Sequence, residues 1–160
     1  DYERMIRLKT GALAALAVYT GMRAAGKEHE ESKVFASLFA GVGVGFQILD
    51  DVKNISAGNA GKKRGDDIVE GKKSMPVILH IEKCPEDAAV LTSCFEQARR
   101  EGIDSSAVEK AITLLSSSGS IAEAEEQGRG AIASVLNRLD ARYGSTAREM
   151  FEMLFDLMQS

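Results

Sequence analysis

The chain has 160 residues, of which 44% are hydrophobic and 28% are charged, and its formal net charge is −4. These values suit one compact domain or a large part of one, and the negative balance offers no general attraction for nucleic acid. The first residues form neither a signal peptide nor an initiator methionine. Cys84 and Cys94 lack metal-ligand spacing, so we interpret them as reduced, semi-buried thiols of a cytoplasmic protein.

The first predicted element is one helix from Tyr2 to Ala25, ended by Gly26. Its expected core stripe consists of Met5, Leu8, Ala12, Ala15, Leu16 and Tyr19. Lys9 and Thr10 interrupt the apolar pattern. Such a pair is more often a lysine reaching to solvent beside a neutral threonine than a functional feature.

A second helix is predicted from Glu30 to about Ile55. Its apolar run from Val34 to Leu49 is shorter than the roughly 20 residues that span a bilayer, so we expect no membrane span. Three glycines, Gly41, Gly43 and Gly45, lie inside this helix. They indicate either close packing against another helix or room for a hydrocarbon chain, and the sequence does not choose between the two.

A polar stripe follows the apolar run. At helical spacing, Gln47, Asp50, Asp51 and Asn54 stand at i, i+3, i+4 and i+7, beside apolar side chains. An Asp-Asp pair near a helix end is usually just solvated. If these carboxylates are partly buried, however, they repel each other and lose hydration, and a divalent cation relieves both problems. An all-oxygen donor set suits Mg²⁺, Ca²⁺ or Mn²⁺ better than Zn²⁺.

The next segment, 56–73, is predicted to be a mobile loop that binds diphosphate. It is rich in glycine and small polar residues. It also carries the cations Lys62, Lys63, Arg64, Lys72 and Lys73 among the acidic residues Asp66, Asp67 and Glu70. A carboxylate stripe followed by a cationic loop suits a polyphosphate bridged to the protein by a metal ion.

The remaining sequence is predicted to be helical scaffold. Ser74 is expected to cap a helix that has Pro76 in its first turn and ends near Lys83, and Pro85 is expected to begin another that ends near Gly102. Further helices are expected after Asp104 or Ser105, from Ile121 to Leu139, and after Ser145. Their inward residues are Val108, Ala111, Ile112, Leu115, Ile132, Val135, Leu136, Leu139, Met150, Phe151, Leu154, Phe155 and Met158.

No segment alternates with period two for long enough to be a strand, so we predict an all-α single domain over residues 1–160. His29 and His80 have no partner at ligand spacing, and we interpret them as surface or core histidines. From about residue 84 onward the sequence indicates scaffold and no chemistry.

A family resemblance emerges from three motifs that occur together. The first is Arg7-Leu8-Lys9-Thr10-Gly11, and the second is Phe46-Gln47-x-x-Asp50-Asp51-x-x-Asn54. The third is Gly61-Lys62-Lys63-Arg64-Gly65-Asp66-Asp67-Ile68-x-Glu70-Gly71-Lys72-x-Ser74-x-Pro76. In order and spacing they resemble the Lys-Thr motif, second aspartate-rich motif and following loop of the trans-isoprenyl diphosphate synthases. This resemblance implies a helical bundle of the isoprenoid synthase type, of which the chain corresponds to the C-terminal half, without the N-terminal helices.

The resemblance also implies a role for each matched residue. The metal ligands are Asp50, Asp51 and Asn54, with Asp67 supporting the metal cluster, and the metal is Mg²⁺, with Mn²⁺ as the alternative. Thr10 and Gln47 stabilise an allylic cation through their oxygens. Lys9, Lys63 and Lys72 hold the allylic diphosphate, and Gln47 lies next to the substrate. Asn54 departs from the usual third aspartate, which weakens the metal site without abolishing it.

The implied reaction joins isopentenyl diphosphate to an allylic diphosphate and releases pyrophosphate. The family's first aspartate-rich motif is not found in this chain. We therefore expect the isolated chain to be inactive while still binding a diphosphate weakly, and to pair as a homodimer or with the missing half. Two alternatives stay open: a non-catalytic partner subunit of a synthase, and a class I terpene cyclase, which the 61–76 pattern disfavours.

Overall fold

The computed structural model describes residues 2–58, 61, 63–145, 148–149 and 151–152. Its elements are α-helical apart from one π-helical and one 3-10 segment, and no strand occurs in this described part of the chain, which confirms the all-α prediction. The residues form two compact units. Unit 1 contains residues 1–46 and 129–160, and unit 2 contains residues 47–128. Helices α3 (His29–Ser56) and α8 (Ser120–Tyr143) each contribute residues to both units.

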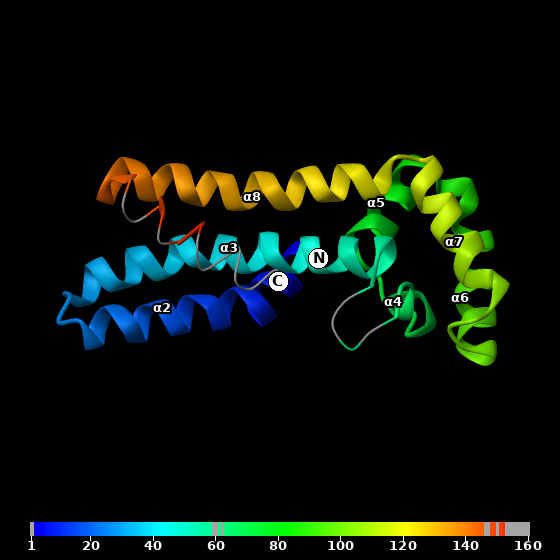
Figure 1. The fold of residues 1–160 in the computed structure, drawn as a ribbon, viewed down its shortest axis with the longest axis horizontal. Helices are drawn as coiled ribbons and strands as arrows, with labels where there is room; N and C mark the ends of the chain where they lie inside the picture. The colour runs from blue at the N-terminus through cyan, green and yellow to red at the C-terminus, as the bar shows by residue number, and fades with distance from the viewer. Residues whose placement is uncertain (1, 59–60, 62, 146–147, 150, 153–160) are drawn as a thin grey trace. The chain divides into compact units, whose positions relative to one another are not determined.

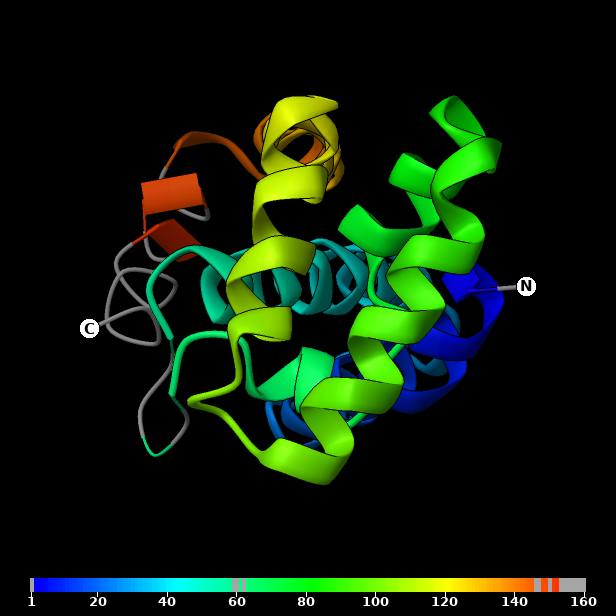
Figure 2. The same cartoon turned by 90° about the vertical axis from the view of Figure 1, so that its right-hand side faces the viewer.

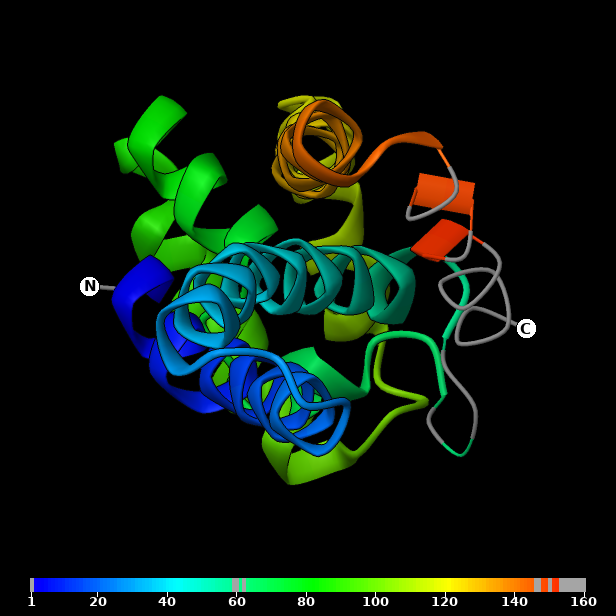
Figure 3. The ribbon, with the colours of Figure 1, turned by 90° about the vertical axis from the view of Figure 1, so that its left-hand side faces the viewer.

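Unit 1 begins with a helical run that is interrupted where the sequence predicted one regular helix. Tyr2–Ile6 is α1, Arg7–Gly11 is a π-helical turn, and Ala12–Ala24 is α2. Gly26 follows with φ 77°, a left-handed conformation that ends the run as predicted. The chain then turns back, so that α2 lies beside the first part of α3 (Figures 1 and 3).

The expected core stripe of this first run is wrong. Met5, Leu8 and Leu16 are exposed, Leu8 by 67%, and Ala12 is also exposed. The buried residues are Ile6 and Gly11 instead. A π turn adds a residue to the helical cycle, which shifts the register of the following side chains relative to an uninterrupted helix. Met5 precedes the π turn, however, and α2 contains no buried residue at all, so the apolar pattern of residues 2–24 does not mark a face that is buried within this chain.

The sequence left open whether the glycines of α3 allow close helix packing or leave room for a hydrocarbon chain, and at Gly43 the structure shows close packing. A Cβ atom on Gly43 would lie 2.8 Å from Cα of Gly11, and one on Gly11 would lie 2.8 Å from the carbonyl oxygen of Ala40. A Cβ on Gly41 would lie 3.1 Å from a methyl group of Val135. The small residues thus let the π-helical turn approach the backbone of α3. At Gly43 the space is taken by protein and holds no hydrocarbon cavity.

The rest of unit 1 is held together by apolar and aromatic contacts. Phe35 stacks on Phe39 at 5.1 Å and meets the ring of Tyr143 edge-on at 4.8 Å between centroids. Ile132, Val135, Leu136 and Leu139 on α8 are buried, as the sequence predicted. Phe151 is buried too, whereas Met150, Leu154, Phe155 and Met158 lie outside the described residues.

Helix α3 itself is long and apolar enough to cross a membrane when judged by length and composition alone. It is longer than the apolar run from which the sequence predicted no membrane span. Interior helices of soluble proteins pass the same test, and 44% of the most apolar window of α3 is buried within the protein. One helix of this kind is weak evidence for a membrane span.

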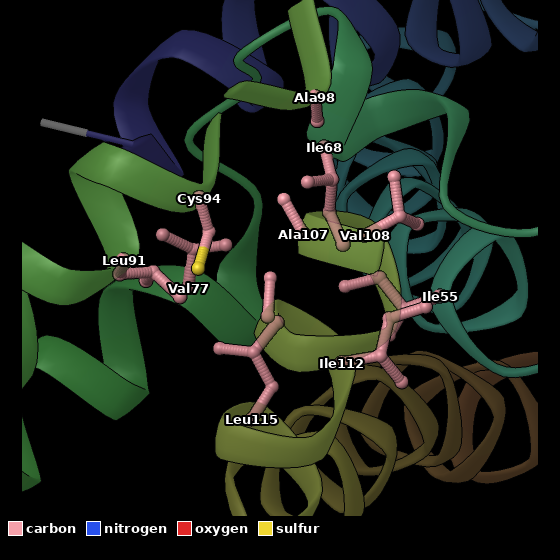
Figure 4. Packing of buried hydrophobic residues seen from close by; sticks show 11 residues of the cluster. Ile55, Ile68, Val77, Leu91, Cys94, Ala98, Ala107, Val108, Ile112 and Leu115 are labelled. Atoms are coloured by element: carbon pink, nitrogen blue, oxygen red, sulfur yellow. The ribbon is translucent and has the colours of Figure 1, made fainter. Parts of the chain in front are cut away.

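Unit 2 is built from short helices around one apolar cluster. They are α4 (Asp66–Val69), α5 (Met75–Lys83), the 3-10 turn η2 (Pro85–Asp87), α6 (Ala88–Glu101) and α7 (Ser106–Ser117). Helices α6 and α7 lie side by side (Figures 1 and 2). The cluster contains Ile55, Ile68, Val77, Leu91, Cys94, Ala98, Ala107, Val108, Ala111, Ile112 and Leu115 (Figure 4).

Most helix ends in unit 2 follow the sequence signals. Gly102, with φ 86°, ends α6, and the side chain of Ser105 accepts a hydrogen bond from the N–H of Ala107 at the start of α7. Ser74 occupies the position before α5 as predicted, but its hydroxyl makes no capping hydrogen bond. The segment predicted to be a loop over 56–73 contains α4, in which Asp67 and Ile68 are buried. Lys62 of that segment lies outside the described residues.

Candidate active site

The candidate site lies in unit 2, where the end of α3 meets α4 and the start of α5. Its frame is set by Gly65, which is buried and has φ 90°. A Cβ atom there would come within 2.5 Å of Val108, so both the conformation and the space require glycine. The N–H of Gly65 donates to the carbonyl oxygen of Asn54 over 2.9 Å, which returns the chain to α3 and starts α4.

Asn54 holds α4 in place. Its side-chain oxygen accepts a hydrogen bond of 3.0 Å from the N–H of Asp67, in the first turn of α4. Its side-chain nitrogen is buried and has no hydrogen-bond partner. The structure therefore engages the Asn54 oxygen with protein backbone, and the sequence-based assignment of Asn54 as a metal ligand stays a prediction.

Asp51 occupies the centre of the site and is completely buried. Its Oδ2 atom accepts the N–H of Met75 at 3.1 Å, and its Oδ1 atom accepts the side-chain amide of Gln47 at 3.2 Å. The carboxylate thus binds one of the free N–H groups at the start of α5, where the helix dipole also favours negative charge. This contact takes the place of the cap that the sequence assigned to Ser74, whose hydroxyl is buried without a partner.

Lys72 joins Asp51 to Asp67. Its Nζ atom lies 2.7 Å from Oδ1 of Asp51 and 2.8 Å from Oδ2 of Asp67, and its side chain is 31% exposed. Burial by itself lowers the pKa of Lys72, but the hydrogen bonds to Asp51 and Asp67 outweigh burial and raise that pKa above its ordinary value of 10.5. Two carboxylates and one ammonium leave the cluster with one net negative charge.

The other sequence-predicted residues are placed less centrally. Asp50, the neighbour of Asp51, is half-buried, as is Gln47. The stripe is thus split between a buried side that holds Asp51 and Asn54 and a more open side that holds Asp50. Lys63 is largely exposed, with its Nζ atom 4.0 Å from a carboxylate oxygen of Asp104. Arg64 forms an ion pair with Glu109.

Lys9 and Thr10 belong to unit 1, on the π-helical turn. Lys9 is exposed and Thr10 is half-buried. Single π turns inside α-helices occur frequently at functional sites. The motif alone indicated these two residues. The π turn could not be predicted, because an insertion into the helical cycle leaves no distinct residue pattern.

Comparison with known proteins gives consistent matches. Residues 1–115 match the family model described as polyprenyl synthetase. Over 75% of the chain, the sequence is 33% identical to the geranylgeranyl pyrophosphate synthase paxG of Penicillium paxilli, of which it covers 31%. Over 98% of the chain, it is 29% identical to a geranylfarnesyl diphosphate synthase of Aeropyrum pernix, of which it covers 48%. The chain therefore spans half or less of the length of these relatives.

The fold has a close counterpart among solved structures. A crystal structure of a geranylgeranyl pyrophosphate synthase superimposes with a TM-score of 0.82, over 94% of this chain and 47% of that one, at 22% sequence identity. At this level of identity the likeness concerns the fold. It confirms the helical bundle of the isoprenoid synthase type that the sequence predicted.

Proposed function

Because this chain belongs to the polyprenyl synthetase family, we propose that it carries the allylic diphosphate site and second metal-binding motif of a prenyltransferase that condenses isopentenyl diphosphate with an allylic diphosphate. The observation that supports this proposal is the buried cluster of Asp51, Asp67 and Lys72. It combines two buried carboxylates with one cation, and Lys63, Arg64 and Lys73 lie in the same segment of the chain as Asp67 and Lys72. That combination suits a site where a metal ion and an anionic substrate are held together.

The residues fit a divalent cation of the magnesium type. The donors available are carboxylate oxygens, which Mg²⁺ and Mn²⁺ prefer, and the net charge of the cluster is negative. Asp50 and Asp51 would be the ligands, with Asp67 beside them. A bound ion would supply positive charge to neutralise the diphosphate leaving group.

The protein's own groups hold the substrate and limit its reactions. Lys9 and Lys63 are exposed cations that attract a diphosphate. Lys72 donates to two carboxylates, and because an ammonium has three N–H donors, the third can bind a phosphate oxygen while both of these contacts stay in place. The side-chain amide of Gln47 donates to Asp51, and an amide oxygen is the kind of group that can stabilise positive charge on an allylic group. Apolar helices around such a group exclude water, which would otherwise capture the cation.

We further propose that the isolated 160-residue chain binds a diphosphate but does not turn it over. Family members ionise the substrate with metal ions held by two facing aspartate motifs, of which this chain contains the second. A cluster with half of its ligands is poorly preorganised, and the rate depends steeply on preorganisation. The groups that bind the diphosphate are present in the chain.

The test is calorimetric titration of the purified chain with pyrophosphate in the presence of Mg²⁺. We expect binding that disappears when Mg²⁺ is chelated, and that weakens at least about tenfold in Asp50→Asn and in Lys63→Ala. Asp140→Asn and Lys110→Ala change exposed residues of the same types outside the motifs and serve as matched controls. In an active synthase that contains this segment, Asp50→Ala should lower the rate at least about a hundredfold.

Two results would contradict the proposal. If a chain with native helical content binds no pyrophosphate at all, a non-catalytic partner subunit becomes the better explanation. If the isolated chain forms prenyl product from isopentenyl and allylic diphosphates at ordinary enzymatic rates, the second motif alone suffices, and the proposed dependence on a facing motif is wrong.

A further inference from the structure

A second group of potential metal ligands lies at the other end of α5, apart from the aspartates of the candidate active site. His80 is on the last turn of α5, Cys84 follows its end, and Asp87 closes the 3-10 turn η2. Pro85 prevents the helix from continuing and turns the chain back, so that a ligand atom of each residue lies within 4.8 Å of the other two. His80 is buried, whereas Cys84 and Asp87 are half-buried.

The hydrogen bonds around His80 determine which of its ring nitrogens carries the proton. The Ser118 hydroxyl donates its single proton to the carbonyl oxygen of Leu115 over 3.1 Å. The same hydroxyl oxygen lies 2.9 Å from Nδ1 of His80, so it accepts the Nδ1–H. In the neutral ring, Nε2 then carries a lone pair.

This nitrogen lies close to a carboxylate. Nε2 of His80 is buried and has no hydrogen-bond partner, and Oδ2 of Asp87 lies 3.3 Å away. A buried ring nitrogen that lacks a partner and lies next to a carboxylate is unfavourable unless a positive charge satisfies both groups. A metal ion supplies that charge and satisfies both groups.

We propose that Nε2 of His80, Sγ of Cys84 and Oδ2 of Asp87 bind a transition-metal ion of the zinc class. Nitrogen, thiolate and carboxylate donors suit Zn²⁺ and are a poor set for Mg²⁺. Binding displaces the thiol proton of Cys84, and the resulting thiolate and carboxylate neutralise the dication while the imidazole stays neutral. A histidine that binds zinc through one ring nitrogen usually donates the N–H of its other ring nitrogen to a neighbouring acceptor. For His80 that acceptor is the hydroxyl oxygen of Ser118.

The consequences of such a site are structural first. The ion ties the end of α5 to the 3-10 turn before α6, and through Ser118 it also orients the end of α7. Three protein ligands leave a fourth tetrahedral position, which the half-buried Cys84 and Asp87 leave open to water or to an external ligand. Together with the proposed magnesium site, the chain would have two chemically distinct cation sites, an all-oxygen one for Mg²⁺ and a mixed one for Zn²⁺.

The site is tested by titrating the purified, reduced and metal-free chain with Co²⁺, whose thiolate complexes absorb by charge transfer in the near ultraviolet. We expect one equivalent to bind with such a band, and Zn²⁺ to displace it. Cys84→Ser should remove the band. Cys94→Ala is the matched control, because Cys94 is the other cysteine and is buried in the apolar cluster (Figure 4); this variant should keep the band.

Two further variants probe the remaining contacts at half-buried positions. Asp87→Asn should weaken Co²⁺ binding at least about tenfold, and Ser118→Ala by about tenfold while the band stays visible. Zn²⁺ should raise the melting temperature of the wild-type chain and leave that of Cys84→Ser unchanged. The alternative is a metal-free pair in which Nε2 is protonated and donates to Asp87. Absence of stoichiometric Co²⁺ binding would favour that alternative and overturn the proposal. A band that survives Cys84→Ser would overturn it as well, because the thiolate would then come from Cys94.

Discussion

The Nζ atom of Lys72 lies 2.7 Å from Oδ1 of Asp51, a carboxylate with no exposed surface. The same ammonium reaches Asp67, so one partly exposed lysine neutralises part of the charge of two buried aspartates. The arrangement links a residue assigned to diphosphate binding with two residues assigned to the metal. Binding of a metal ion and release of Lys72 toward a phosphate are therefore expected to be coupled.

Replacing Lys72 by methionine should destabilise the fold, because Asp51 and Asp67 lose their common cation. We expect a loss of about 2 kcal/mol in the free energy of unfolding, below the cost of breaking a fully buried pair since Lys72 is partly exposed. Urea denaturation followed by circular dichroism measures the change. Lys73→Met, at an exposed neighbour, should change stability by less than about 0.5 kcal/mol.

The unfolding measurement on Lys72→Met can be repeated with Mg²⁺ added. The ion should restore more stability to Lys72→Met than it adds to the wild type, because the carboxylates of the variant no longer have a competing ammonium. Equal losses in the Lys72 and Lys73 variants would show that the ion pair contributes nothing.

The raised pKa of Lys72 gives a specific dependence of stability on pH. The contribution of Lys72 is fully present below its unfolded pKa of about 10.5, and it is lost as pH rises through the higher folded pKa. The difference in unfolding free energy between wild type and Lys72→Met should therefore be constant from neutral pH to about 10. Above 10.5 it should shrink by up to about 1.4 kcal/mol per pH unit. A difference that grows with pH in this range would contradict the assigned direction.

Gly43→Ala tests the close approach of the π-helical turn to α3. The new Cβ atom would lie 2.8 Å from Cα of Gly11 and 3.0 Å from the carbonyl oxygen of Thr10, so backbone has to move. We expect a loss of about 1–3 kcal/mol in unfolding free energy. The matched control is Gly21→Ala in α2, where nothing lies within 4 Å, and which should stabilise the protein by up to about 1 kcal/mol. Tolerance of both substitutions would mean that the space beside Gly43 is not filled by protein.

Ser105 and Ser74 both precede a helix, but only Ser105 caps its helix with a side-chain hydrogen bond. Ser105 accepts the N–H of Ala107, and Ser105→Ala should cost about 1 kcal/mol. Ser74 precedes α5, but its buried hydroxyl has no hydrogen-bond partner, and Asp51 binds the N–H of Met75 instead. Ser74→Ala should therefore be neutral or slightly stabilising in the same unfolding measurement. A loss of similar size at both positions would show that Ser74 caps α5 after all.

The features that local chemistry controls could be predicted from the sequence alone. Gly26 and Gly102 adopt the left-handed conformation that ends a helix, and Ser105 begins one. These signals act over a few residues, so they hold whatever the chain packs against. The family could also be predicted, because a motif is a property of sequence order. The motif here is the series Gln47, Asp50, Asp51 and Asn54, followed by the cationic segment.

Other features depend on segments that are distant in the sequence, and only the tertiary structure decided them. The apolar stripe assigned to residues 2–24 was wrong: Met5, Leu8 and Leu16 are exposed, and Gly11 on the π turn is buried against Ala40 instead. The cap of α5 comes from Asp51, whose carboxylate reaches Met75 across 24 positions in the chain.

The grouping of His80 with Cys84 and Asp87 was missed for a related reason. The spacing His80-x-x-x-Cys84-x-x-Asp87 is visible in the sequence, but it matches no common ligand pattern. The turn after Pro85 brings Asp87 back toward His80, and Ser118, 38 positions away, selects the tautomer. Sequence order determines which groups are available. Burial and long-range hydrogen bonds determine which of them meet, because each buried polar atom takes the partner that the packed chain places beside it.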